Sequence, residues 1–416
     1  MRLHLMPLLA LSCLMVACGD KDDSGDTGST ADSGAVASGD FGFCSRIVEN
    51  FCYLSGEHTE DLTLTASYHY VLEGGVFIGD DTSTNTMYIE PGVTIYGDTA
   101  TKGFLTIRRN ASIEAIGTAE APIVFTSPIA IGSRARSDWG GIILNGNAEI
   151  NNCYDGAEQL PCEAEGEGGT GTYGGSDNSD SSGTLQYVRV EFGGIEISTE
   201  NEVNGIAFQG VGSGTTVDYV QVHFNKDDGV EFFGGAVQVS HLVLSGIGDD
   251  SLDYTDGWVG GATDVYVQHI DGYESDRGME MDNNGDANDA TPTSDPTISN
   301  VLISGSSDGD TGFLAREGTK GTYSNINITG AKNCFDIDGD QTWANIQAGE
   351  LTVTGSTFDC ENTVKNDDGD EDPKDGQPDE SFNADIEGWL LEDNSEGSVD
   401  GSAPSWATGW TESASN

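Results

Sequence analysis

The sequence predicts an all-β domain in which short strands stack coil upon coil. Three observations support this prediction: one apolar strand motif recurs along the chain, a second motif recurs in step with it, and amphipathic helices are missing. Two short strands in each 22–25 residues cannot bury their apolar faces alone, whereas stacked repeats can. The expected architecture is therefore a single-domain solenoid.

The first motif is a run of four residues rich in β-branched side chains. It occurs at residues 187–190, 219–222, 241–244, 264–267, 300–303 and 325–328. Its second members stand at positions 188, 220, 242, 265, 301 and 326, so the intervals are 32, 22, 23, 36 and 25 residues. Two of the coils are therefore expected to carry insertions.

The second motif follows the first within each coil. It occurs at residues 205–208, 229–232, 251–254, 278–281, 312–315 and 334–337. Side chains alternate between the two faces of a strand, so Val230 and Phe232 are expected to point inward and Glu231 outward. Strands of like direction in successive coils are expected to pair as parallel sheets.

Helices are not expected to dominate this chain. The mature part has no apolar stripe of period 3.6 over several turns, and 58 glycines among 416 residues disfavour long helices. A β-propeller would need a repeat of about 40–50 residues. The shorter period favours a solenoid.

The period, the strand–turn–strand layout and three phrases of the upstream half carry a family resemblance. The phrases are Ile89–Ile95, Gly117–Ser127 and Trp139–Leu144. Together they resemble the right-handed parallel β-helix of the pectate-lyase-like superfamily, and exported bacterial β-helix proteins of poorly defined function within it. The resemblance covers about residues 65–345 and implies a right-handed parallel β-helix domain over residues 44–379. It implies a fold rather than an activity.

The first residues have the pattern of an export signal. Arg2 precedes an apolar stretch that ends at Ala17 and is too short to cross a membrane. The stretch Leu14–Gly19 resembles the lipobox of bacterial lipoproteins, which implies cleavage of residues 1–17 and lipidation of Cys18. Residues 18–43 then have the Gly/Ser/Asp/Thr composition of a flexible acidic tether. We therefore expect an exported protein that is lipid-anchored to the bacterial envelope, at the outer membrane and exposed on the surface.

Six cysteines remain in the mature chain after Cys18. Six cysteines allow 15 connectivities. Local spacing favours the pairs Cys44–Cys52, Cys153–Cys162 and Cys334–Cys360. Disulfides agree with an oxidising compartment outside the cytoplasm.

The net charge restricts the partners of the chain. There are 71 Asp and Glu against 16 Lys and Arg, and 71 − 16 gives a net charge of −55. A polyanion of this size repels the phosphates of nucleic acids and an anionic membrane surface. We therefore expect no nucleic-acid partner, membrane contact through the lipid anchor only, and a polysaccharide or cell-surface partner.

Aligning the second motif coil by coil reveals an outward column of carboxylates in three consecutive coils. Stacked carboxylates about 4.8 Å apart repel one another unless they are solvated, protonated or neutralised by a cation. Calcium is the expected cation, because it selects hard oxygen ligands. The expected calcium ligands are Asp228, Glu231, Asp250, Asp253, Glu280 and Asp282.

Two other interpretations of this column stay open. It could simply be a solvated face. It could also be an active site, because Asn225–Asp227 and Asp249–Asp250 look like two motifs of β-helix polygalacturonase-like hydrolases, whose next motifs are missing. The candidate catalytic residues are then Asp227, Asp249 and Asp250, with Arg277 or, alternatively, Arg316 as the basic residue of a calcium-dependent lyase.

The C-terminal part begins with an acidic, glycine-containing loop at residues 366–379. Apolar residues return beyond it, including Trp389, Trp406 and Trp410. Because the ends of a solenoid need a cover, residues 380–416 are expected to form a cap and tail.

These observations together predict a cell-surface lipoprotein whose acidic face binds calcium and mediates carbohydrate or cell-surface contact. The alternatives are a polysaccharide hydrolase or a calcium-dependent lyase of the same fold, and a purely structural envelope protein.

Overall fold

The computed structural model describes residues 42–153, 161–197, 203–306, 309–365 and 379–413. The signal sequence, Cys18, the tether up to residue 41 and most of the acidic loop at residues 366–379 lie outside these ranges. The chain divides into two units, Met1–Gly42 and Phe43–Asn416, and the fold below is that of the second. None of the helices in the described ranges is long and apolar enough to span a membrane.

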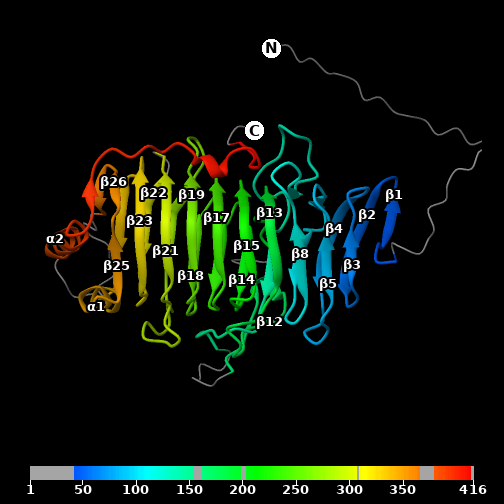
Figure 1. The fold of residues 1–416 in the computed structure, drawn as a ribbon, viewed down its shortest axis with the longest axis horizontal. Coiled ribbons are helices and arrows are strands. Elements are labelled where there is room, and N and C mark those ends of the chain that lie inside the picture. The colour runs from blue at the N-terminus through cyan, green and yellow to red at the C-terminus, as the bar shows by residue number, and fades with distance from the viewer. Residues whose placement is uncertain (1–41, 154–160, 198–202, 307–308, 366–378, 414–416) are drawn as a thin grey trace, which may run out of the picture. The chain divides into compact units, whose positions relative to one another are not determined.

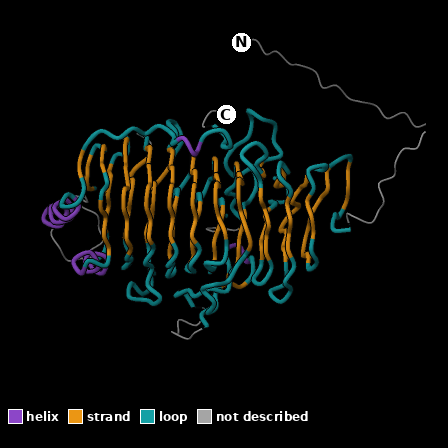
Figure 2. Tube along the Cα trace, in the orientation of Figure 1, coloured by secondary structure: helices purple, strands orange, loops and turns teal. Residues whose placement is uncertain are grey.

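The second unit is a right-handed parallel β-helix, as expected (Figure 1). Its strands pair in parallel from coil to coil and form three rows, one for each side of a coil. Strands dominate and helices are few (Figure 2).

The first and second rows share several long strands, each of which turns a corner in its middle. The first row contains β3 (Leu62–Leu64), β5 (Thr86–Ile89), β8 (Ser112–Ile116) and β25 (Leu351–Thr354). The second row contains β6 (Thr94–Gly97), β9 (Ile123–Thr126), β26 (Thr357–Asp359) and β28 (Ser395–Glu396). The strands shared by both rows are β13 (Gly183–Glu191), β15 (Thr216–His223), β17 (Gln238–Ser245), β19 (Gly261–Gln268), β21 (Thr297–Ser304) and β23 (Gly321–Thr329).

The third row carries the second sequence motif. It contains β7 (Phe104–Ile107), β10 (Ile142–Asn145), β14 (Ile206–Gln209), β16 (Val230–Phe233), β18 (Leu252–Thr255), β20 (Ser275–Met281), β22 (Gly309–Ala315), β24 (Asn333–Ile337) and β27 (Asn362–Val364). The strands β2 (Phe51–His58) and β4 (His69–Ile78) contribute to both the second and the third row.

A few elements lie outside this scheme. The first strand, β1 (Arg46–Val48), pairs antiparallel with β2. A small hairpin joins β11 (Ala164–Glu165) to β12 (Thr172–Tyr173) around the short helix η1 (Glu167–Gly169). The helices are α1 (Asp340–Ala348), α2 (Asp379–Leu390) and the short η2 (Ser405–Ala407).

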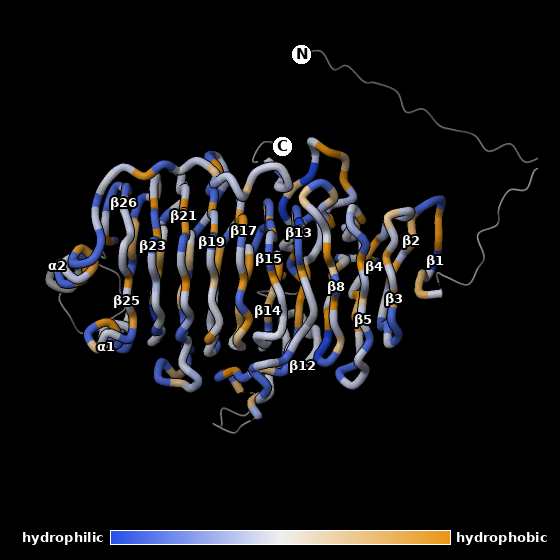
Figure 3. The backbone as a smooth tube through the Cα atoms, viewed as in Figure 1, coloured by the Kyte–Doolittle hydropathy of each residue, from blue (hydrophilic) through white to orange (hydrophobic). Residues whose placement is uncertain are grey.

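The strand register agrees with the sequence alignment at every coil. The first motif aligns Val188, Val220, Leu242, Val265, Val301 and Ile326. The second aligns Ile206, Val230, Leu252, Met279, Phe313 and Phe335. All of these side chains are buried, because the alternation of apolar and polar residues leaves one register that fills the interior. Figure 3 shows that both apolar and polar residues occur along the strands.

The corner between the first and second rows has a distinct backbone conformation. One residue per coil adopts a positive φ of 50–57° there, although none of these residues is a glycine. The column consists of Tyr187, Tyr219, His241, Asp264, Asn300 and Asn325. Its aromatic part is stacked: the ring centroids of Tyr187 and Tyr219 are 4.5 Å apart, and those of Tyr219 and His241 are 4.1 Å apart.

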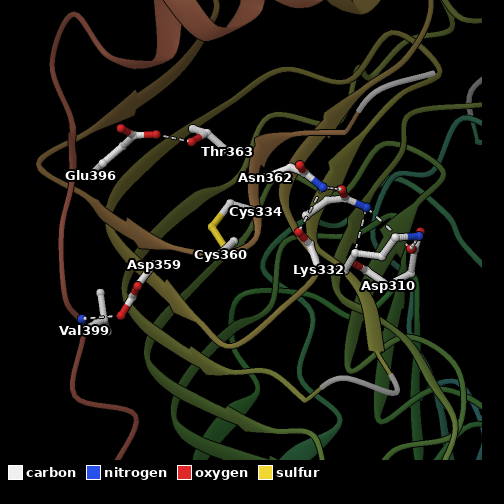
Figure 4. The surroundings of a disulfide bond; sticks show 10 residues. Asp310, Lys332, Cys334, Asp359, Cys360, Asn362, Thr363, Glu396 and Val399 are labelled. Carbon is white, nitrogen blue, oxygen red and sulfur yellow. Dashed lines mark hydrogen bonds and ion pairs between the residues drawn. A yellow bond between two sulfur atoms is a disulfide. The ribbon is translucent and has the colours of Figure 1, made fainter. Parts of the chain in front are cut away.

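The three expected disulfides are confirmed: Cys44–Cys52, Cys153–Cys162 and Cys334–Cys360. The third links the start of β24 to the residue that follows β26, in the next coil (Figure 4). Beside it, Asn362 donates a side-chain hydrogen bond to the carbonyl oxygen of Lys332, and Thr363 bonds Glu396. The local cross-link therefore joins neighbouring coils.

The C-terminal residues follow two different courses. Ile386 and Leu390 of α2 are buried in the main core, beside the last coils. Beyond β28 the chain runs back over earlier coils (Figure 1), and Trp410 packs against Tyr187 and Tyr219 of the second unit's middle coils. We call residues 397–413 the strap. Its tryptophans thus cover the side of the solenoid and not its end.

Candidate functional site

The acidic ladder lies on the outer side of the third row. We use this name for Asp228, Glu231, Asp250, Asp253, Glu280 and Asp282, which belong to three successive coils. Glu231 of β16 aligns with Asp253 of β18, which aligns with Glu280 of β20. The inward neighbours of these residues fill the core, so the carboxylates must point away from it.

The turns that lead into β16 and β18 are linked through carboxylates. The backbone N–H of Asp250 donates a hydrogen bond to Oδ1 of Asp228 at 2.9 Å. One coil later, the backbone N–H of Arg277 donates to Oδ1 of Asp250, also at 2.9 Å. The stacking of the turns therefore fixes the positions of both aspartates.

The ladder is largely buried, so its interpretation as a solvated face is wrong. Five of its residues are at most 9% exposed, namely Asp228, Glu231, Asp250, Glu280 and Asp282. Asp253 is partly exposed, but its Oδ1 atom is buried and has no hydrogen-bond partner among the described residues. A buried carboxylate costs free energy unless a hydrogen bond or an opposite charge compensates it.

Two arginines compensate the half of the ladder nearer the C-terminus. Nη1 of Arg277 lies 2.6 Å from Oε2 of Glu280, 2.8 Å from Oδ2 of Asp276 and 3.3 Å from Oδ2 of Asp250. Arg316 bonds Glu280 through Nη2, and its Nε lies 3.0 Å from Oδ2 of Asp282. Arg277 is thus held by three carboxylates.

The pKa values of Asp250 and Glu280, which lie in neighbouring coils, shift in opposite directions. Burial raises the pKa of Asp250 well above its usual range, and the neighbouring Glu280 raises it further. Burial also acts to raise the pKa of Glu280, but the hydrogen bond with Asp250 and the charges of Arg277 and Arg316 outweigh it, so this pKa is lowered. Asp250 is therefore the more basic of these two carboxylates. Burial and the charge of Glu280 raise the pKa of Asp282 to about 8 despite Arg316.

The half of the ladder nearer the N-terminus lacks such compensation. Oxygen atoms of Asp228, Glu231 and Asp253 all lie within 4.8 Å of one another. Neither Asp228 nor Asp253 forms an ion pair with a residue of the described ranges, while Nδ2 of Asn204 donates to Oε2 of Glu231 at 2.6 Å. Burial first, and then the neighbouring carboxylates, raise the pKa of both aspartates well above the usual range. This triad is the place in the ladder where a cation would be most strongly favoured.

The candidate catalytic residues lie at the rim of the ladder. Oxygen atoms of Asp227 and Asp249 come within 4.8 Å of each other and of Asp228. Asp249 reaches the surface but is partly shielded from water by its surroundings, and this desolvation, followed by the charge of Asp276, raises its pKa. The structure therefore brings the two rim aspartates together, but it places Arg277 in ion pairs rather than free at the rim.

Sequence reasoning missed one participant. Asp276 joins Asp249 and Asp250 in a third group of carboxylates within 4.8 Å. Its position directly before Arg277 was the available signal. Arg316, the other arginine that the sequence placed on the acidic face, reaches Glu280 and Asp282 from the following coil. It is therefore paired, like Arg277, and not free at the rim.

Known proteins resemble this chain at the level of a family. No curated protein and no solved structure matches the chain. A family model described as a pectate-lyase-like beta helix domain matches residues 56–411, which is most of the chain and includes the whole ladder. The chain therefore belongs to the family of pectate-lyase-like β-helix domains.

Proposed function

We propose that this protein is an exported lipoprotein whose acidic ladder binds calcium and mediates contact with a carbohydrate or a cell surface. Lipidation of Cys18 would anchor it to the bacterial envelope, at the outer membrane and exposed on the surface. The ion would lie between Asp228, Glu231 and Asp253. These three residues come from two adjacent coils, so the ion would also link the coils.

One observation carries the calcium proposal: three carboxylates meet in a buried place where two of them have no cationic partner among the described residues. Leaving such charges unpaired is costly, and protonation or a bound cation removes the cost. Carboxylate oxygens are the ligands that Ca²⁺ prefers. The hydrogen bond that Nδ2 of Asn204 donates to Oε2 of Glu231 helps to position Glu231.

The other expected calcium ligands have different partners. Asp250, Glu280 and Asp282 each form an ion pair with an arginine. A second cation there would have to overcome the charges of Arg277 and Arg316. The proposal therefore places one ion at the triad and none between the arginines.

Calcium titration by calorimetry, together with thermal melting in chelator and in calcium, tests this proposal. We expect one site per chain and a higher melting temperature with calcium. Asp253→Asn should weaken binding at least tenfold. Asp336→Asn is the matched control, because Asp336 stands in the same outward column but is paired with Lys365 at 2.8 Å. A melting temperature that does not change with calcium would remove the proposal.

Carbohydrate contact is tested by glycan binding with and without calcium, and depolymerisation of the bound glycans is assayed on the same sample. The proximity of Asp227 and Asp249 favours the polysaccharide-degrading enzyme as the second candidate function. Cleavage that Asp249→Asn abolishes without changing the melting temperature would favour that enzyme. Binding of neither calcium nor glycan would favour a purely structural envelope protein.

The anchor is tested independently of the site. Labelled palmitate should be incorporated into the full-length precursor and not into its Cys18→Ser variant. Equal labelling of the two, or no labelling of either, would contradict lipidation at Cys18.

A further inference from the structure

Two loops with exposed apolar side chains leave the solenoid along one edge. Residues 127–138 follow β9, and residues 269–274 follow β19. Both strands belong to the second row and run in parallel, so their C-terminal ends meet the same edge. Figure 1 shows the strands of this row ending at one side of the domain.

Hydrogen bonds give the loop at residues 127–138 a fixed shape. Oδ2 of Asp138 accepts bonds from the hydroxyl of Ser127 at 2.5 Å and from the backbone N–H of Ala135 at 3.0 Å. Nε of Arg134 donates to the carbonyl oxygen of Ile129 at 3.0 Å. The ends of the loop are thus closed on each other, and its tip is held in place.

Arg136 joins this loop to the second one. Its guanidinium group donates to the carbonyl oxygens of Gly246 and Ile247 and, at 2.8 Å, to that of Glu274. It also lies over the ring of Tyr273, 5.4 Å from the centroid. One arginine therefore ties both loops to each other and to the coil between them.

The tied loops expose large apolar side chains. Ile131 is 85% exposed, Tyr273 is 43% exposed and Ile129 is 37% exposed. These apolar side chains are not needed for packing between the coils, because they lie outside the strands. An ordered loop that holds an isoleucine in water is typical of an interaction surface, because the fixed shape lowers the entropy cost of binding.

Acidic side chains lie beside this apolar surface. Asp271 and Glu274 flank Tyr273 in the second loop and are exposed. The surface therefore combines an apolar projection with a negatively charged border.

The geometry points to a protein-docking surface formed by Ile129, Ile131 and Tyr273. Its partner would be a protein with an apolar pocket bordered by lysine or arginine, which complements both the projection and its acidic border. A second copy of the chain would bring another net charge of −55 to the contact, so it is disfavoured. The same charge disfavours an anionic bilayer. This surface is separate from the acidic ladder, and the inference does not rest on the proposed function.

A photo-crosslinking amino acid at position 131, in cells of the organism that makes the protein, tests the inference. The matched control is the same amino acid at Ile116, which is 44% exposed at the end of β8. We expect a protein adduct at position 131 that is missing at position 116. The adduct partner is then purified, and its affinity is measured for the wild type, Ile131→Glu and Ile116→Glu.

The expected result is a loss of at least tenfold in affinity for Ile131→Glu alone, together with weaker binding of the wild type at high salt. Equal affinities for the wild type and Ile131→Glu would overturn the inference, as would the lack of any adduct specific to position 131. Co-sedimentation of the wild type, but not of Ile131→Glu, with vesicles of phosphatidylglycerol and phosphatidylethanolamine would assign the surface to lipid and also overturn it.

Discussion

The backbone N–H of Asp250 donates a hydrogen bond to the carboxylate of Asp228, which lies one coil earlier, at 2.9 Å. The carboxylate therefore has a structural task as an acceptor, in addition to its charge. An asparagine at position 228 would keep an acceptor oxygen while removing the charge. The substitution Asp228→Asn therefore distinguishes the effect of the charge from the effect of the hydrogen bond.

Asp228→Asn is expected to stabilise the protein in chelator at pH 7, by about 1–3 kcal/mol, because it removes one of several crowded buried carboxylates. In calcium the order should reverse, since the variant loses a ligand. Urea unfolding in both conditions measures this. If the variant were less stable than the wild type in chelator as well, charge repulsion in the triad would be refuted.

His223 should make the protein sensitive to acid. Burial, followed by the charges of Arg189 and Arg136, lowers the pKa of His223 to about 3. The unfolded chain takes up this proton near pH 6.5, so the stability contributed by the neutral imidazole is complete above that pH and is lost as the pH falls towards 3. At pH 5 the loss from this residue is about 2 kcal/mol relative to pH 7.

His223→Gln should reduce the loss of stability between pH 7 and pH 5 by that amount. Glutamine can still hydrogen-bond the hydroxyl of Ser245, which lies 2.8 Å from Nδ1 of His223. Chemical unfolding at the two pH values gives the difference. Identical pH dependences of the variant and the wild type would show that the imidazole is not the responsible group.

The side chain of Gln209 is expected to lower the free energy of unfolding, compared with an apolar side chain of similar shape. Its side chain is fully buried, and neither amide atom has a hydrogen-bond partner among the described residues. An unpaired buried amide costs about 1–3 kcal/mol, whereas methionine has a similar shape and no such cost. Gln209→Met should therefore raise the free energy of unfolding by about 1 kcal/mol.

The control for Gln209→Met is the same substitution at Gln221. That side chain is equally buried, but it bonds the hydroxyl of Ser245 and both backbone groups of Glu412. Gln221→Met should therefore destabilise the protein. A loss of stability in both variants would mean that burial alone, and not hydrogen bonding, decides the result.

Trp410 is expected to hold the strap on the solenoid. It is only 3% exposed, whereas many residues around it in the strap are exposed. Trp410→Ala should release the strap locally, so the amide proton of Glu412, which bonds Oε1 of Gln221 at 2.7 Å, should exchange faster. Hydrogen exchange measures this, with Trp406→Ala as the milder control because Trp406 is less buried. Unchanged protection at Glu412 would show that other contacts hold the strap.

The sequence pattern was enough to predict which residues pair between successive coils. It was not enough to predict whether the side chains of the acidic ladder are exposed or buried. Val230 and Phe232 alternate with Glu231, and a shift by one residue would turn the carboxylate into the core, so one register is possible. The same alternation does not reveal whether an outward position is exposed. For Glu231 and Glu280 the sequence left a calcium site, a solvated face and an active site open, and the structure shows that both residues are buried.

The sequence pattern also did not reveal which carboxylates the arginines pair with. Arg277 and Arg316 stand in different columns of neighbouring coils, and only the side-chain geometry brings both to Glu280. The position of Trp410 depends on a contact with Tyr187 across more than 200 residues. The disulfides, by contrast, join cysteines 8, 9 and 26 residues apart, and local spacing was enough to pair them.

The direction of β1 has a consequence for association between molecules. The open end of a parallel solenoid is a template on which the end of another molecule could polymerise. The strand β1 pairs with Phe51–Tyr53 of β2 in the antiparallel direction. The backbone groups that it pairs are no longer open to the end of another molecule. The first strand thus shields part of this end against association.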